Sequence, residues 1–130
     1  MSLLAVAVAA VGITGCADDD RPPTWSYIHE AIIEPNCTQS ACHSNISATA
    51  GVELWDRELG FTVLTGRPCQ STGSPAEADG NFVVPGDPAS SRLVYMLRGI
   101  ETRNMPPDIP LPDTDIRLIE DWILRGAPCD

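Results

Sequence analysis

Five cysteines in a chain of only 130 residues constrain its fold more than any other feature of the sequence. Three Trp, two Tyr and two Phe leave few large side chains from which to build a core. A domain of this size with a thin core usually needs disulfides or a bound cofactor to be stable. The cysteines are therefore the first candidates for structural or binding roles, and their odd number leaves at least one outside any set of internal pairs.

The first cysteine follows an apolar segment. Residues 2–14 carry no charge and are mostly Leu, Ala and Val. This segment is too short to span a bilayer, but its length suits the apolar part of an export signal. The sequence Ile13-Thr14-Gly15-Cys16 comes next and resembles a bacterial lipobox, although no basic residue precedes the apolar segment. This resemblance implies a signal peptide at 1–15, a lipid on Cys16 and an acidic tether at 16–23 that buries nothing. The alternative is a buried helix with a chance cysteine.

An exported, lipid-anchored chain belongs to the bacterial cell envelope or periplasm, where disulfides and covalently attached cofactors persist. The net charge is −10 and all eight basic residues are Arg, which argues against a nucleic-acid partner because binding phosphates needs a basic face. The mean hydropathy of −0.04 excludes a protein with many membrane spans. The sequence shows no acid–base pair, phosphate-binding loop or nucleophile triad that would indicate an enzyme.

The domain at 24–130 is expected to be all-α, with three to four short helices and long loops rich in Pro and Gly. Apolar residues at helical spacing from Trp25 to Ile33 predict a helix that Thr24 caps and Pro35 ends. Residues 36–51 and 66–81 are expected to be loops, and 61–64 could be helical or extended.

Two further helices are expected in the C-terminal half. Asp87 as N-cap and Pro88 at the first position predict a helix that Gly99 ends. Residues 104–113 contain four prolines and cannot be helical. Asp113 or Thr114 is expected to cap the last helix, whose apolar stripe comprises Ile116, Ile119, Trp122 and Ile123.

The strongest chemical motif is Cys37-Thr-Gln-Ser-Ala-Cys42-His43. Covalent haem attachment uses two thiols and a histidine beside the second thiol, usually as C-x-x-C-H. Three alternatives compete with haem. They are a Cys37–Cys42 disulfide with an incidental His43, a zinc site that would recruit His29, Cys69 and Cys129, and a nucleophilic Cys–His pair.

Several stretches resemble small class I-like c-type cytochrome domains of the planctomycete and myxobacterial type, which include a C-x4-C-H variant of the motif. These stretches lie at 83–93, 104–107 and 116–127, and the resemblance covers 26–128. It implies a cytochrome c-like fold around one covalent haem c, with the last helix packed across the first. Cys37 and Cys42 would form the thioethers, and His43 and Met105 would be the axial ligands of the haem iron.

Two other residues compete for the distal position. Met96 lies among Leu93, Val94 and Leu97, where core packing explains it. His29 lies on the first helix and is expected to be at the surface or bonded within the protein. Met105 is favoured because Pro106 and Pro107 stiffen the backbone after it.

The resemblances leave Cys69 and Cys129 as a disulfide pair if Cys16 carries lipid and Cys37 and Cys42 carry haem. The bridge would close a loop of about 60 residues and contribute about 4 kcal/mol in the loop-entropy treatment. Without haem, four cysteines would allow three pairings, among which the sequence does not choose.

A haem with both His and Met ligands has no open position, so the resemblance implies one-electron transfer rather than catalysis. The expected protein is a lipid-anchored monohaem c-type cytochrome whose redox partners have basic docking surfaces. The alternative is a non-haem envelope lipoprotein, stapled by disulfides, that serves as an interaction module. Membership of a larger oxidoreductase complex stays open.

Overall fold

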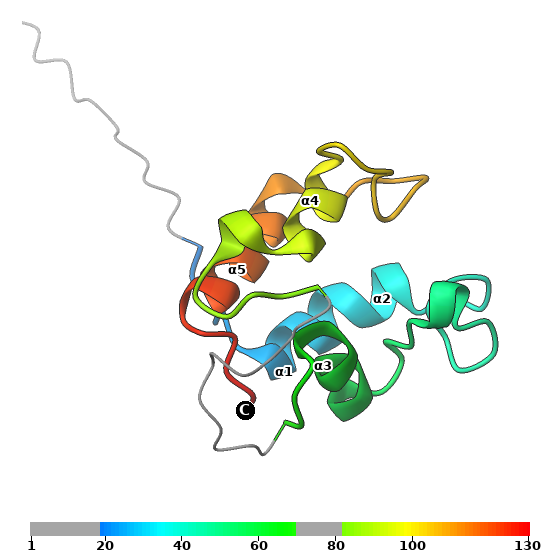
Figure 1. The fold of residues 1–130 in the computed structure, drawn as a ribbon, viewed down its shortest axis with the longest axis horizontal. Helices are drawn as coiled ribbons and strands as arrows, with labels where there is room; N and C mark the ends of the chain where they lie inside the picture. The colour runs from blue at the N-terminus through cyan, green and yellow to red at the C-terminus, as the bar shows by residue number, and fades with distance from the viewer. Residues whose placement is uncertain (1–18, 70–81) are drawn as a thin grey trace, which may run out of the picture.

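The computed structural model describes residues 19–69 and 82–130, which form helices and loops and contain no strand (Figure 1). The expected all-α class is confirmed for these residues. None of their helices is long and apolar enough to cross a membrane. The elements, in chain order, are α1 Trp25–Ile28, the π-helix η1 His29–Ile33, α2 Glu34–Cys37, the 3-10 turn η2 Thr49–Gly51, α3 Arg57–Thr65, the 3-10 turn η4 Pro88–Ser90, α4 Arg92–Arg98 and α5 Asp113–Leu124.

The first helix does not end at Pro35. Elements α1, η1 and α2 follow one another without a break, so the helix continues to Cys37. Proline lacks an N–H and crowds the preceding turn, and the wider π-helical turns ahead of Pro35 give its ring room. The Asn36 side chain adds a bond by donating from Nδ2 to the carbonyl of Ile32 at 2.8 Å. The helix therefore carries Cys37 at its last position.

Three aromatic side chains join the first, third and last helices. Trp25 of α1 and Trp122 of α5 are fully buried and stack with their ring centres 5.2 Å apart. Phe61 of α3 packs edge-on against both. The two indole N–H groups donate to the carbonyls of Arg57 and Pro128, so neither is left unpaired in the core. The last helix thus packs against the first, as expected.

The stretch at 61–64, which the sequence leaves open, lies in α3. Asp56 caps this helix by accepting a hydrogen bond from the backbone N–H of Leu59 at 2.9 Å. Gly66 ends it with φ +73°, a left-handed conformation that glycine adopts without strain. Capping at both ends therefore favours a helix over an extended conformation for this stretch.

The helix expected from Pro88 to Gly99 is split. Asp87 caps only the short turn η4, and the chain leaves helical geometry at the buried Ser91 before α4 begins. The Ser91 hydroxyl accepts from the N–H of Val84 and donates to the carbonyl of Asp87. These bonds compete with helical ones, which is why the serine interrupts the helix. Gly99 ends α4 as expected.

The apolar stripe of α5 is confirmed, since all four of its expected residues are buried. The expected cap is wrong, because neither Asp113 nor Thr114 caps the helix and Pro112 occupies the N-cap position. Asp113 pairs with Arg98 and Arg117 instead.

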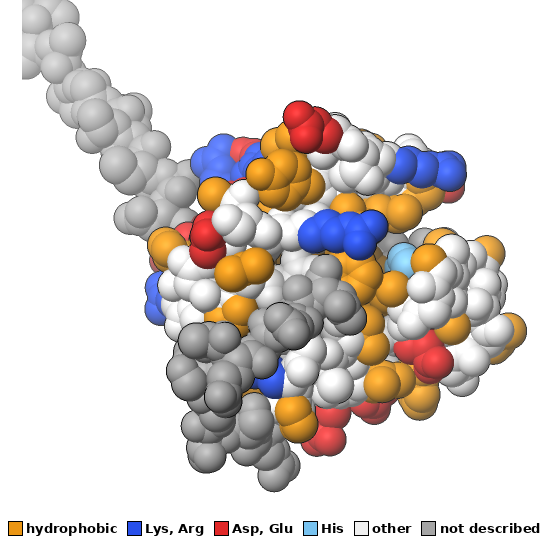
Figure 2. All heavy atoms as spheres, in the orientation of Figure 1, with side chains coloured by type: hydrophobic (Ala, Val, Ile, Leu, Met, Phe, Trp, Pro, Cys, Tyr) orange, Lys and Arg blue, Asp and Glu red, His pale blue; other side chains and the backbone are white. Residues whose placement is uncertain are grey.

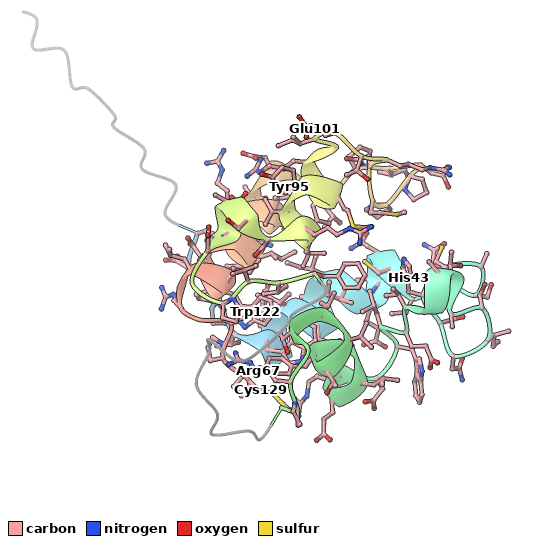
Figure 3. The ribbon with its side chains drawn as sticks, in the orientation of Figure 1. His43, Arg67, Tyr95, Glu101, Trp122 and Cys129 are labelled. Carbon is pink, nitrogen blue, oxygen red and sulfur yellow. A yellow bond between two sulfur atoms is a disulfide. The ribbon has the colours of Figure 1, made fainter. Side chains whose placement is uncertain are left out.

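Cys69 and Cys129 form a disulfide, which confirms the expected pair. The two residues are 60 positions apart, and their bond joins the end of α3 to the C-terminus (Figure 3). Figure 3 shows Cys129 well separated from His43.

The expected tether is not free of the domain in its described part, residues 19–23. Arg21 is half-buried and donates to a carboxylate oxygen of Asp115 in α5 at 2.5 Å. The expectation that this segment has nothing to bury is therefore wrong for Arg21.

Candidate functional site

The four side chains proposed to hold a haem line one pocket. Cys37, Cys42 and His43 come from α2 and the turn after it, and Met105 comes from the Pro-rich segment between α4 and α5. The pocket has a volume of about 170 Å³ and is open to solvent, which makes it smaller than the ~300–1,000 Å³ usual for cofactor sites. Figure 2 shows a histidine side chain in a hollow bordered by hydrophobic side chains, where Figure 3 labels His43. The rest of the lining is Asn36, Ala41, Thr49, Arg103, Pro106 and Pro107.

The four residues between the two cysteines form a turn. The N–H of Cys42 donates to the carbonyl of Gln39 at 2.8 Å, and the N–H of His43 donates to the carbonyl of Cys37 at 3.0 Å. This second bond closes the turn back onto the end of the helix. The C-x4-C-H spacing thereby brings both thiols and the imidazole to the same pocket.

The His43 ring is held by the backbone of the following loop. Its Nδ1 lies 3.1 Å from the carbonyl oxygen of Val52, and the N–H of Leu54 donates to the carbonyl of His43 at 2.9 Å. Because a carbonyl only accepts hydrogen bonds, Nδ1 is assigned the proton. The lone pair then lies on Nε2, which is the arrangement of metal-binding histidines whose other nitrogen donates to a carbonyl.

Met105 is fixed to the end of α4. Its N–H donates to the carbonyl of Met96 at 2.9 Å, and the Asn104 side chain donates to the carbonyl of Pro106 at 3.1 Å. Gly99 suits this turn, because its φ of +62° is a left-handed conformation that other residues rarely adopt and a Cβ there would lie only 3.0 Å from Oδ1 of Asn104. The Met105 side chain therefore enters the pocket from a constrained loop.

The two rivals of Met105 lie elsewhere. His29 is 5 % exposed, and its Nε2 is 2.9 Å from the carbonyl oxygen of Leu54 and thus bonded within the protein, as expected. Met96 does not line the pocket. It is half-buried and outside the core cluster that contains Leu93 and Leu97, so the expectation that it packs in the core is wrong.

The alternatives to haem find little support among the described residues. Cys37 and Cys42 are not bonded to each other. Burial, and secondarily the neighbouring Cys42, raises the pKa of the Cys37 thiol to about 12, which keeps it protonated and unsuited to nucleophilic attack. Cys69 and Cys129, which a zinc site would need, are joined to each other, and residues 19–69 and 82–130 contain no group of three or more His, Cys, Asp or Glu side chains that could hold a metal ion.

Sequence reasoning missed two contributions to the site. Arg103 supplies the only charged side chain among the described residues of the lining. Its place just before Asn104 and Met105 was the available signal. The carbonyl of Val52 holds His43, and a backbone acceptor leaves no mark in the sequence.

Cys16, the expected lipidation site, lies outside the described residues. Comparisons of this chain with models of protein families, with curated proteins and with solved structures found no match.

Proposed function

We propose that the chain is a lipid-anchored monohaem c-type cytochrome with a cytochrome c-like fold, and that it transfers single electrons in the periplasm or cell envelope. One observation carries the proposal. Cys37, Cys42 and His43 line the same pocket as Met105, which lies 62 positions later in the chain than His43. Two thiols, an imidazole with a free Nε2 and a thioether form the donor set of a covalent haem with His and Met ligands.

Each residue has a separate role in this proposal. Cys37 and Cys42 would hold the haem through two thioether bonds, each thiol adding to a vinyl group so that its sulfur forms the C–S bond and its proton goes to the neighbouring vinyl carbon. His43 and Met105 would supply the imidazole and thioether ligands of the iron. A bound haem supplies a reversible one-electron change at that iron. The bond from His43 to Val52 makes the imidazole a stronger donor, and the soft sulfur of Met105 favours the ferrous state.

Two kinds of partner belong to the proposal. The net charge of −10 favours redox proteins with basic docking surfaces, because opposite charges speed the encounter. A lipid on Cys16 provides the membrane attachment. A non-haem lipoprotein stapled by the Cys69–Cys129 disulfide is the alternative.

Covalent attachment is the direct test. Co-expressed with the cytochrome maturation machinery, the protein should be coloured, keep its haem through acid–acetone extraction and denaturing electrophoresis, and weigh one haem more than the polypeptide. Cys42→Ala should lose more haem than Cys37→Ala, because Cys42 is adjacent to His43 and fixes its approach. Extractable haem would contradict covalent attachment, and a colourless protein with a Cys37–Cys42 disulfide would leave only the non-haem alternative.

Lipidation is tested at Cys16. Cys16→Ser should accumulate as an unprocessed precursor without lipid, while the haem domain still folds and keeps its absorption spectrum. Mass spectrometry of the membrane fraction measures processing and acylation together. A mature native protein without acyl chains would show the lipobox interpretation to be wrong.

Arg103→Gln should lower the midpoint potential, because a positive charge beside the pocket disfavours the ferric state. Arg103 is exposed, so solvent screens its charge, and the expected shift is on the order of tens of mV, below the ~70 mV that a unit charge about 10 Å away would give at an effective dielectric constant of about 20. Redox titration measures the shift. Arg92→Gln is the matched control, since Arg92 lies over the ring of Phe82 and does not line the pocket. Equal potentials in the two variants would contradict the role of Arg103.

A further inference from the structure

One helix separates the proposed anchor from the pocket. The segment from α1 to α2 begins at Trp25, where the chain leaves the tether, and ends at Cys37 in the pocket lining. At about 1.5 Å per residue, this helix is roughly 18 Å long. Trp25 is fully buried, so the point where the tether meets the domain is fixed by the core. Figure 1 shows residues 19–23 towards one end of the long axis and α2 with its following loop towards the other.

The tether is held at that first end by Arg21. Its guanidinium donates to both carboxylate oxygens of Asp19, at 2.8 and 2.6 Å, and to Asp115 of α5 at 2.5 Å. The side chain of Asp115 is only 18 % exposed, so this contact lies against the domain. The same hydrogen bonds lower the pKa of Asp19, which keeps its carboxylate charged at neutral pH. We call this three-residue contact the Arg21 bridge.

The bridge shortens the reach of the anchor. When it is formed, only the chain from Cys16 to Asp19 links the lipid to the domain, which spans at most about 10 Å. When it is broken, the free chain extends from Cys16 to Trp25 and spans up to about 30 Å. The shorter reach is less than the length of the helix and the longer reach exceeds it. With the bridge formed, the domain therefore cannot turn its pocket end directly onto the bilayer, because the anchor would have to span the length of the helix.

Resting on the proposed lipid at Cys16 and haem at Cys37 and Cys42, we infer that the Arg21 bridge holds the pocket away from the membrane. The electron partner is then a protein that approaches from the aqueous phase, and not a carrier dissolved in the bilayer. The opposite orientation is a physical alternative, because Ile46, in the loop after His43, and Ile109, beside the pocket in the Pro-rich segment, are 81 % and 79 % exposed. These side chains would suit insertion into lipid if the reach allowed it.

Energy transfer from the membrane to the haem tests the orientation. The lipidated, haem-loaded full chain is reconstituted in phosphatidylcholine vesicles with a trace of headgroup fluorophore whose emission overlaps the haem absorption. The wild type should quench the donor weakly. Arg21→Gln should raise the quenching by about twofold or more, because the reach increases about threefold. A flexible Gly-Ser insertion after Asp18, which keeps the bridge but lengthens the anchor, should raise it as well.

Arg117→Gln is the matched control. Arg117, like Arg21, pairs with an aspartate of α5, in this case Asp113, but it lies within α5 and does not contact the tether. It should quench as the wild type does. Equal quenching by the wild type and Arg21→Gln, at either a weak or a strong level, overturns the inference. Failure of the proposed function is recognised separately, since a chain without haem colour or without acyl groups is identified before reconstitution.

Discussion

Replacing both Cys69 and Cys129 with Ser is expected to lower the free energy of unfolding by roughly 2–5 kcal/mol. The disulfide closes a segment of 60 residues, so its loss restores a large conformational freedom to the unfolded chain. It also frees the C-terminus, where the carbonyl of Pro128 accepts the bond from the Trp122 indole. Urea unfolding followed by tryptophan fluorescence measures the change.

The haem content of this double variant separates its two roles. Neither cysteine lines the proposed haem pocket, so the variant should keep covalent haem while it loses stability. The slope of its unfolding free energy against urea concentration (the m-value) should not fall, because the unfolded chain becomes less compact without the disulfide. A loss of less than about 1 kcal/mol would show that the bridge adds little to this fold, and a loss of haem would place Cys69 or Cys129 in the cofactor site.

Helices with a strong local signal could be predicted from the sequence. The spacing of Trp25, Ile28 and Ile32 and the stripe of α5 mark faces that are buried in the structure. These predictions succeed because apolar residues at every third or fourth position lie on one face of a helix, and that face is stabilised by packing against the core. Gly99 ends α4 as predicted because the backbone there is left-handed, a conformation that glycine adopts easily since it has no Cβ.

Helix ends that depend on distant partners could not be predicted. Pro35 fails to end the first helix because π-helical turns and the Asn36 side chain accommodate it. Asp113 fails to cap α5 because Arg98, from another helix, pairs with its carboxylate. In each case the sequence contains the local preference but not the competing interaction, which arises only once the elements are packed together.

The candidate site divides in the same way. The Cys37, Cys42 and His43 motif is local and visible in the sequence, whereas the placement of Met105 in the same pocket rested on a family resemblance. The chain itself achieves that placement by bonding the N–H of Met105 to the end of α4. The acceptor for His43 and the position of Arg103 depend on loop geometry, for which hydrophobic spacing carries no signal.

Replacing Met105 with Ala is expected to remove the sulfur ligand and lower the midpoint potential by about 100 mV or more, because axial ligands set haem potentials over a wide range. The soft thioether that favours ferrous iron is lost, and Ala offers no donor. The weak sulfur-to-iron charge-transfer band at the red end of the oxidised spectrum should disappear. The emptied position should bind small exogenous ligands that the wild type excludes.

Met96→Leu makes this test specific, since it replaces the other methionine of the described residues with a side chain of similar volume. Met96 offers Met105 only its carbonyl oxygen, which Leu retains, and its side chain is half-buried outside the core. The variant should therefore keep the band and the potential and lose less than about 1.5 kcal/mol of stability. His29→Ala should also keep the band, because the bond to Leu54 already occupies its Nε2. If the band instead survives Met105→Ala and vanishes in Met96→Leu, the distal ligand is Met96, and its side chain must leave its observed position on α4 to reach the iron.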